Sequence, residues 1–176
     1  MRALGGKFRM QIERPYTSEV PLIFATIVHP ELTTPITVCT DTIDYLYNSQ
    51  ATNLGQVTFL GFPFDLELIC DSDKPPRGRI TIQNVDKRVG EALRDIVDSP
   101  KLSLEILAAS DFNENVRPRT PIGTPFVQYG AYFLRMEKTS VDPMNISADI
   151  GSWDLSAEPW PYNRTTQDTL PDLYRR

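Results

Sequence analysis

The sequence predicts a mainly β protein, a β-barrel or sandwich with one short α-helix and extended terminal arms. Two observations predict this fold class. Large apolar residues recur at every second position over 62–70, and the same period returns at 79–83 and 102–109. Clusters of Pro, Gly, Asn and Asp separate the apolar runs, as the turns between short strands require. We therefore expect about eight strands around one core.

The strands should lie within a single domain, residues 17–152. In chain order, the β-branched, aromatic or alternating runs that predict them are residues 22–28, 36–39, 42–47, 57–60, 62–70, 77–83, 102–109, 126–137 and 146–150. The turn sequence 71–76 separates two of these runs by only a few residues. We expect those two to pair as a hairpin.

One helix is expected at residues 86–97. Val89, Leu93, Ile96 and Val97 follow the i, i+4, i+7, i+8 spacing of a short amphipathic helix. This apolar stripe should pack on the sheet.

The two ends of the chain predict arms. Residues 1–16 are polar and basic and predict a flexible N-terminal arm. Residues 153–176 have no period, but prolines favour an extended backbone there, and large apolar side chains are frequent. Those that could anchor the C-terminal arm in a subunit interface are Trp153, Trp160, Tyr162, Leu173 and Tyr174. Docking on the chain's own sheet and docking on a neighbouring copy both remain open.

Composition argues against most catalytic and nucleic-acid-binding roles. A net charge of -5 disfavours a protein whose main task is to grip phosphates. The single histidine, His29, ends an apolar run and is better explained as a polar strand terminus than as a general base. The sequence shows no phosphate-binding loop, no paired metal-ligand spacing and no nucleophile elbow. We therefore expect no enzyme, no catalytic residue, no cofactor and no metal.

Cys39 and Cys70 both occupy strand-like positions. Two buried free thiols are favoured over a disulfide, because a domain of this length does not need one, and this favours a reducing compartment. The apolar run at 21–28 is far shorter than a membrane span, so no membrane contact is expected.

Four sequence motifs, taken in order, carry a resemblance. They are Ile27-Val-His-Pro-Glu-Leu-Thr-Thr-Pro-Ile36, Pro75-Pro-Arg-Gly-Arg-Ile-Thr-Ile-Gln-Asn-Val-Asp86, Glu158-Pro-Trp-Pro-Tyr162 and Leu170-Pro-Asp-Leu-Tyr174. With Phe62-Pro-Phe64 and Glu91-Ala-Leu-Arg94, their order over residues 16–176 resembles a family of small tail-tip proteins of long-tailed phages and prophages. That family, of the distal or minor tail type, was long described only as a domain of unknown function.

The resemblance implies a barrel related to the phage tail-tube fold and a structural role without catalytic residues. The implied partners are further copies of the chain in a ring, with six-fold symmetry favoured over three-fold, together with the tail-tube protein and the baseplate hub proteins. The ring would line a channel that DNA meets only in transit. The implied location is the virion, after assembly in the host cytoplasm.

Four carboxylates of the predicted hairpin are candidates for the wall of such a channel: Asp65, Glu67, Asp71 and Asp73. An acidic wall would avoid the phosphate contacts that hold DNA-binding proteins in place. The hairpin also carries cations, so a solvated tip whose charges pair with one another is the other interpretation.

Three other functions remain as alternatives. The weakest is a hydrolase that would use Asp71 and Asp73 with calcium, because Asp-Ser-Asp lacks the remaining oxygen ligands of a loop site. A carbohydrate-binding module could use the aromatic faces of Trp153, Trp160 and Tyr162. A nucleic-acid-binding module could use the basic residues Lys74, Arg77, Arg79, Lys87, Arg88 and Arg94. The basic stretch lacks interleaved aromatic residues, which such a module would use for base stacking.

Overall fold

The computed structural model describes residues 9, 13–17, 19–51, 55–67, 77–83, 98–142 and 144–151. Its strands are β1 (Pro21–Val28), β2 (Ile36–Cys39), β3 (Tyr45–Tyr47), β4 (Val57–Gly61), β5 (Phe64–Glu67), β6 (Arg77–Gln83), β7 (Lys101–Ala108), β8 (Tyr129–Val141) and β9 (Asn145–Gly151), with one 3-10 turn, η1 (Ala109–Asp111). The prediction of a mainly β protein is confirmed. The predicted helix at 86–97 and the C-terminal arm at 153–176 lie outside the described residues.

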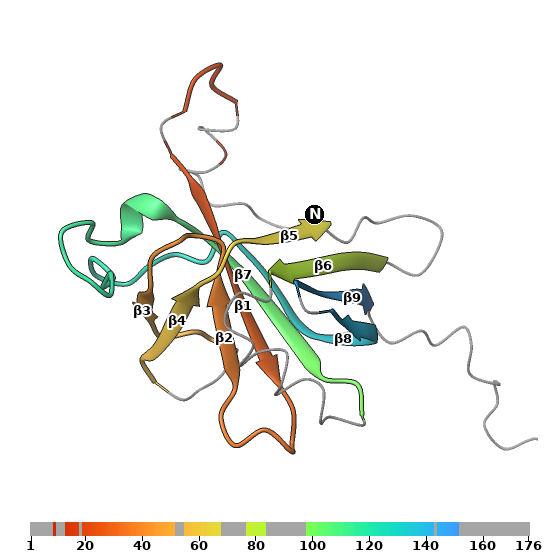
Figure 1. The fold of residues 1–176 in the computed structure, drawn as a ribbon. Helices are drawn as coiled ribbons and strands as arrows, with labels where there is room; N and C mark the ends of the chain where they lie inside the picture. The colour runs from red at the N-terminus through yellow and green to blue at the C-terminus, as the bar shows by residue number, and fades with distance from the viewer. Residues whose placement is uncertain are drawn as a thin grey trace, which may run out of the picture.

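All nine strands belong to one open, mixed sheet with the order β3-β4-β2-β1-β7-β8-β9-β6-β5 (Figure 1). Neighbouring strands are antiparallel except β2 and β4, which run parallel. The predicted hairpin is present as β5 and β6, which pair from Phe64 opposite Ile82 to Glu67 opposite Arg79.

The sheet is strongly curved. β4 ends at Gly61 and β5 starts at Phe64, although these strands lie near opposite ends of the strand order. Three peptide links reach at most about 11 Å, so the two ends of the sheet must approach each other here. This curvature is compatible with the predicted barrel.

The central strand β1 is buried on both faces because two cores lie on its two sides. Ala25 and Ile27 belong to a large aliphatic core that also contains residues of β6, β7, β8 and β9. Leu22 and Phe24 face the other way, into a smaller core. This second core is aromatic: the Phe24 ring lies 5.1–5.6 Å from those of Tyr45, Tyr47, Phe59 and Phe112.

Two strands differ clearly from their predicted bounds. The run at 42–47 shortens to Tyr45–Tyr47, because the Asp41 carboxylate accepts a hydrogen bond from Thr42 N at 2.6 Å and a bend precedes the strand. The run at 126–137 becomes Tyr129–Val141. β8 contains two register shifts, with Phe133 and Lys138 in the left-handed region (φ 59 and 50), and such bulges break the two-residue period used for the prediction.

Candidate subunit interface

The two ends of the sheet are β3 and β5. An edge strand presents backbone N–H and C=O groups that can pair with another chain, unless the protein covers them. What covers each of these edges therefore decides where a neighbouring copy could bind.

The β3 edge is closed by the connection between β7 and β8. Arg119 forms a parallel bridge with Tyr45. Its backbone N–H donates to Asp44 O at 2.9 Å, and its carbonyl accepts from Leu46 N at 2.8 Å. The chain thus uses its own backbone to pair this edge.

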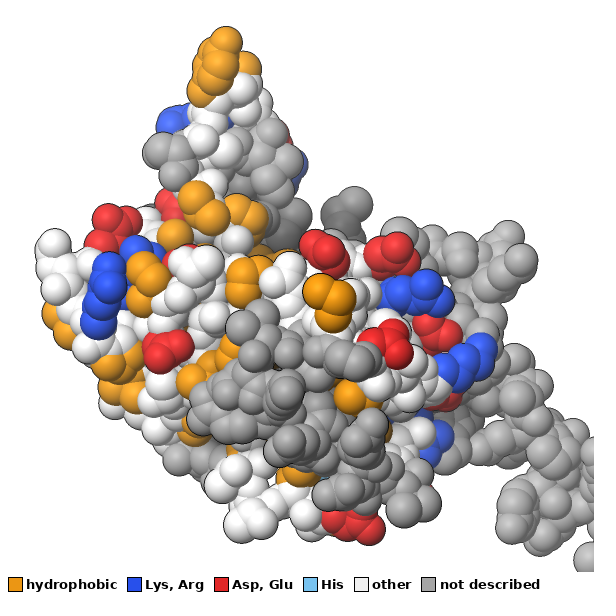
Figure 2. All heavy atoms as spheres, viewed as in Figure 1, with side chains coloured by type: hydrophobic (Ala, Val, Ile, Leu, Met, Phe, Trp, Pro, Cys, Tyr) orange, Lys and Arg blue, Asp and Glu red, His pale blue; other side chains and the backbone are white. Residues whose placement is uncertain are grey.

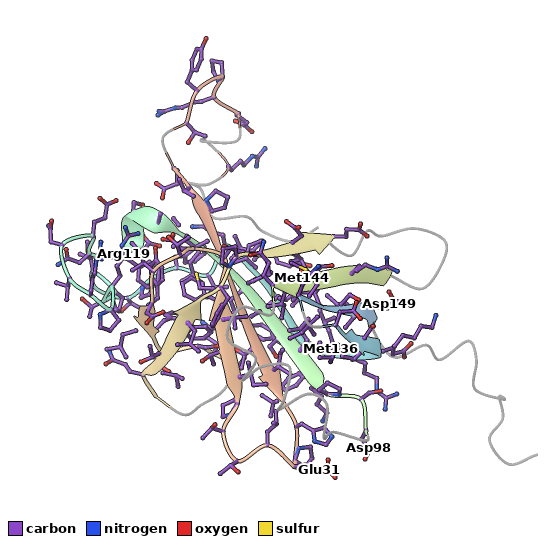
Figure 3. The ribbon with its side chains drawn as sticks, in the orientation of Figure 1. Glu31, Asp98, Arg119, Met136, Met144 and Asp149 are labelled. Atoms are coloured by element: carbon purple, nitrogen blue, oxygen red, sulfur yellow. The ribbon has the colours of Figure 1, made fainter. Side chains whose placement is uncertain are left out.

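Side chains hold that closure in place. Arg119 Nη1 donates to Tyr45 Oη at 2.7 Å and to Asp41 Oδ2 at 3.2 Å, while Tyr45 Oη donates to the same carboxylate oxygen at 2.6 Å. The guanidinium carbon also lies 5.5 Å from the centre of the Tyr45 ring. Burial, followed by the bond to Asp41, raises the pKa of Tyr45, so its hydroxyl stays a neutral donor. We call Asp41, Tyr45 and Arg119 the β3 lock; Arg119 is labelled in Figure 3.

The β5 edge has no such cover within the described residues. Phe64 is buried and Leu66 half-buried against the aliphatic core, while Asp65 and Glu67 are exposed. β5 pairs with β6 on one side, and no described segment pairs with its other side. Arg79, directly opposite Glu67, instead donates from Nε and Nη2 to Asp149 Oδ1 at 3.2 and 3.1 Å.

The predicted channel residues are only partly placed by the structure. Asp65 and Glu67 lie on one exposed face, and Asp71 and Asp73 are outside the described residues. Figure 2 shows side chains of both charge signs interspersed over this side of the molecule. Lys138 Nζ, for example, lies 3.8 Å from Asp149 Oδ2. Acidity of a channel wall is therefore still a prediction.

The five predicted interface residues of the C-terminal arm, Trp153, Trp160, Tyr162, Leu173 and Tyr174, also lie outside the described residues. Their role in an interface therefore remains a prediction.

The described part of the N-terminal arm projects from the body of the molecule (Figures 1 and 2). Residues 13–17 are all exposed, with Tyr16 91% exposed. Arg9 is helical; Glu13 N donates to Arg9 O at 3.1 Å, and Arg9 Nε pairs with Glu13 Oε1 at 3.2 Å. The base of the arm is fixed by Ala109 N, which donates to Val20 O at 3.0 Å.

A buried carboxylate, Glu105, lies at the centre of the sheet on the side of the aromatic core. It is 1% exposed, and its Oε1 accepts from Gln50 N at 3.1 Å and from Tyr132 Oη at 3.0 Å. Gly130, opposite Glu105 in the register, makes room for Tyr132: a Cβ there would lie 2.7 Å from the tyrosine hydroxyl. These contacts hold the β3–β4 connection onto the sheet.

This polar centre ties the segment after β3 to β7 and β8 through Glu105 and Tyr132. Burial, followed by the charge of Glu105, raises the pKa of Tyr132 to about 12 and also raises that of Tyr47. Both phenols therefore stay protonated near neutral pH. Within the described part of the chain, no three His, Cys, Asp or Glu side chains lie close enough to hold a metal ion.

His29 and Cys39 both have structural surroundings. His29, just past the end of β1, is 6% exposed, and its Nδ1 accepts from Glu31 N at 3.1 Å. It is thus a strand terminus, but a buried one. Cys39 is a buried free thiol, and burial raises its pKa to about 12, which disfavours the reactive thiolate. Cys70 lies outside the described residues.

Sequence reasoning missed Glu105 and the β3 lock. Glu105 sits in an alternating run and reads as part of a polar strand face. Leu107 lies two residues later in the same strand and therefore on the same face as Glu105. A large apolar residue there could have indicated that this face is buried. Arg119 lies in a loop without period, so nothing local pointed to Asp41, which is 78 residues away.

Comparison with known proteins places the chain in a family. A search of curated proteins finds no match. Within the described residues, no helix is long and apolar enough to cross a membrane. Residues 9–165 match the family described as Domain of unknown function (DUF1833). Since the match extends over most of the chain, the protein belongs to the DUF1833 family.

Proposed function

We propose that this protein is a structural subunit of a bacteriophage tail tip. Copies of the chain form a ring that joins the tail tube to the baseplate hub and lines the channel through which DNA passes. The protein is then part of the virion and is assembled in the host cytoplasm. It performs no catalysis in this role.

The observation that carries the proposal is the difference between the two ends of the sheet. A ring built from head-to-tail contacts needs two unlike surfaces on each subunit. The β3 edge is paired by the chain itself, whereas β5 has a free side within the described residues. The resemblance of residues 16–176 to phage tail-tip proteins supports the same role from the sequence.

The position of the predicted channel residues is consistent with this role. Asp65 and Glu67 are exposed on β5, beside a face that also holds the Arg79–Asp149 pair. A surface of mixed sign with exposed carboxylates would hold passing phosphates weakly. DNA could then slide along it.

Electron microscopy of negatively stained, purified protein tests the proposal directly. We expect closed rings of one size with a central channel. A protein that stays monomeric at high concentration and is missing from purified tails would contradict the proposal.

The C-terminal arm offers a second test. Because a proline-stiffened segment loses less entropy on docking, its aromatic side chains are suited to anchor a neighbour, at about 2 kcal/mol or more for a good anchor. Removal of residues 153–176 should therefore abolish incorporation into tails while circular dichroism and the melting curve stay those of a folded sheet. If the truncated chain unfolds, the arm belongs to its own core; if tails assemble normally, the interface lies elsewhere.

A further inference from the structure

The polar centre around Glu105 contains buried hydrogen-bond acceptors that no donor satisfies. Glu105 is 1% exposed, and its Oε2 is buried without a hydrogen-bond partner among the described residues. Gln128 is 7% exposed, and its Oε1 is likewise buried and has no partner in the described part of the chain. Because buried polar atoms are paired in the great majority of cases, two such acceptors in one region indicate that a donor or a cation belongs there.

The sheet register brings Gln128 toward Glu105. Glu105 lies opposite Gly130 of β8. Gln128 precedes Gly130 by two residues, and its N–H donates to Ile106 O at 2.9 Å, so the pairing of β7 with this segment continues to Gln128. Residues two apart on a strand share a face, and diagonal neighbours on adjacent strands are about 7–8 Å apart, within reach of long side chains. The two unsatisfied oxygens can therefore face one site.

The donors in this centre are already used. Glu105 Oε1 accepts from Gln50 N at 3.1 Å and from Tyr132 Oη at 3.0 Å. Tyr132 Oη also lies 3.3 Å from Gln50 Oε1, but a phenol has only one proton to donate. The phenol oxygen keeps its lone pairs, so it can still act as an oxygen ligand.

The centre also holds a negative charge that no described cation balances. Among the described residues, no Lys, Arg or His forms an ion pair with Glu105. Burial first, and then the charge of Glu105, raise the pKa of Tyr47 and that of Tyr132, so both phenols beside it are neutral. A buried charge is costly unless it is paired. A water molecule could satisfy the two oxygens, but it would bring no positive charge.

The ligands on hand suit a monovalent cation. One carboxylate with neutral amide and phenol oxygens balances a single positive charge, and hard cations take oxygen ligands. Calcium sites usually contain several carboxylates. Over the ranges that the structure describes, no three His, Cys, Asp or Glu side chains come together in such a site. Gln50 is exposed, so the centre borders the solvent there.

We propose that an alkali-metal cation, Na⁺ or K⁺, binds in the polar centre between Glu105 Oε2 and Gln128 Oε1, with the phenol oxygen of Tyr132 beside it. The cation neutralises the buried carboxylate and is the partner that both oxygens lack. It joins β7 to the start of β8 and, through the bond from Gln50 N to Glu105, supports the segment after β3. Because only the folded chain forms this site, the cation stabilises the fold. This inference does not depend on the proposed ring.

Melting curves in different chloride salts test the site. Protein freed of alkali salts is melted in NaCl, in KCl and in tetramethylammonium chloride, whose cation is too large for the site, always at the same ionic strength. We expect the melting temperature to rise with Na⁺ or K⁺ and then to level off, by about 5–10 °C at about 100 times the dissociation constant. The salt that acts at the lower concentration identifies the preferred ion. Tetramethylammonium should give no such rise.

Two variants assign the effect to this site. Glu105→Gln keeps the shape of the side chain and removes its charge, so the cation-specific rise should disappear. Gln128→Leu removes one ligand and keeps the carboxylate, so the midpoint of the rise should move to a cation concentration about tenfold higher or more. If Glu105→Gln does not fold, Gln128→Leu still carries the test.

Matched controls make the same changes at exposed positions. Glu137→Gln on β8 and Gln83→Leu on β6 should respond to each cation like the unmodified chain. The measured quantity is the response to the cation, so a variant that is less stable in every salt can still be compared.

Three results would overturn the inference. A melting temperature that follows ionic strength but not the identity of the cation would show that a water molecule, or a proton on Glu105, takes the place of the metal ion. A cation-specific rise that persists in Glu105→Gln would place the ion elsewhere on the chain. An unchanged midpoint in Gln128→Leu would remove Gln128 from the site.

Discussion

The β3 and β5 ends of this sheet meet the same physical problem in different ways. Both are terminal strands with backbone groups to satisfy. At β3, a loop supplies two backbone hydrogen bonds and an arginine that joins a tyrosine to an aspartate. At β5, no described segment pairs with the outer side of the strand, and its exposed side chains are the carboxylates of Asp65 and Glu67.

The difference shows that the hydrogen bonds formed within the chain close the β3 edge and, among the described residues, not the β5 edge. The β3 end packs on an aromatic core and is paired by a loop far away in the sequence, so contacts within the chain satisfy this edge. At the β5 end, no described segment pairs with the outer backbone groups, and the exposed charges of Asp65 and Glu67 disfavour unselective pairing. Under the proposed function, the β3 contacts would hold the single chain together and the β5 edge would serve assembly.

The largest expected effect is at the core beneath the β3 end. Phe24→Ala removes a fully buried ring that contacts four aromatic neighbours, and it should lower the free energy of unfolding by about 3–5 kcal/mol. Chemical denaturation measures the loss. Phe133→Ala, at a ring that is 69% exposed, is the control and should cost far less. Equal losses would mean that the aromatic core does not hold this end.

Breaking the β3 lock should make the two ends more alike. Arg119→Ala removes the donor to Tyr45 and Asp41 and should cost about 1–3 kcal/mol, as loss of a charged hydrogen-bond partner does. The Leu46 amide, which donates to Arg119 O, should then exchange with solvent faster. Arg117→Ala, two residues away at an exposed position, should leave both values unchanged. Unaltered exchange at Leu46 in Arg119→Ala would show that the backbone alone closes the edge.

Alkaline pH should lower the stability of the fold through three tyrosines, Tyr45, Tyr47 and Tyr132. The pKa of Tyr132 is raised to about 12 and those of Tyr45 and Tyr47 are raised as well, so the folded state favours the protonated phenols. The contribution of Tyr132 to stability is fully present below the ordinary pKa of 10.0 and is lost as pH rises from there through about 12. The contributions of Tyr45 and Tyr47 are lost in the same direction, as pH rises through their own raised pKa values. Denaturation curves at several pH values in this window measure the loss.

Two tyrosine variants sharpen that test. Tyr132→Phe should make the alkaline loss smaller, because one of the titrating groups is gone. Tyr16→Phe, at a residue 91% exposed, should leave the loss unchanged. If Tyr132→Phe does not alter the pH dependence, the phenol beside Glu105 does not contribute to it.

The smallest expected effect is at His29. Its Nδ1 accepts one backbone hydrogen bond in a turn, so His29→Gln should cost at most about 1 kcal/mol. Under the proposed function, it should also leave tail assembly and infectivity intact. Loss of infectivity by a folded, incorporated variant would show that this histidine has a function beyond structure.

Prediction from sequence was strongest where the local pattern alone decides the structure. The runs at 22–28, 36–39, 57–60 and 77–83 correspond closely to β1, β2, β4 and β6, because β-branched and alternating residues favour strands wherever they are placed. The predicted bounds of β8 were wrong because bulges interrupt the two-residue period. The predicted β3 was too long because the Asp41 carboxylate bonds to Thr42 N ahead of the strand.

The candidate interface could be predicted only in part. Asp65 and Glu67 were singled out from alternation, and their exposure on β5 agrees with it. That β5 is a terminal strand could not be predicted, because strand order depends on pairings such as β6 with β9, which are distant in the chain. The β3 lock was missed for the same reason.

The sequence by itself determined the fold class, most of the strands and the choice of exposed side chains on β5, since these follow from residue type and a two-residue period. Only the tertiary structure decided which edge is closed, which carboxylate is buried and which end of the sheet has no cover among the described residues. The physical reason is that these features depend on hydrogen bonds between segments far apart in the sequence, which no local pattern connects. Examples are the bonds of Arg119 to Asp41 and of Gln50 N to Glu105.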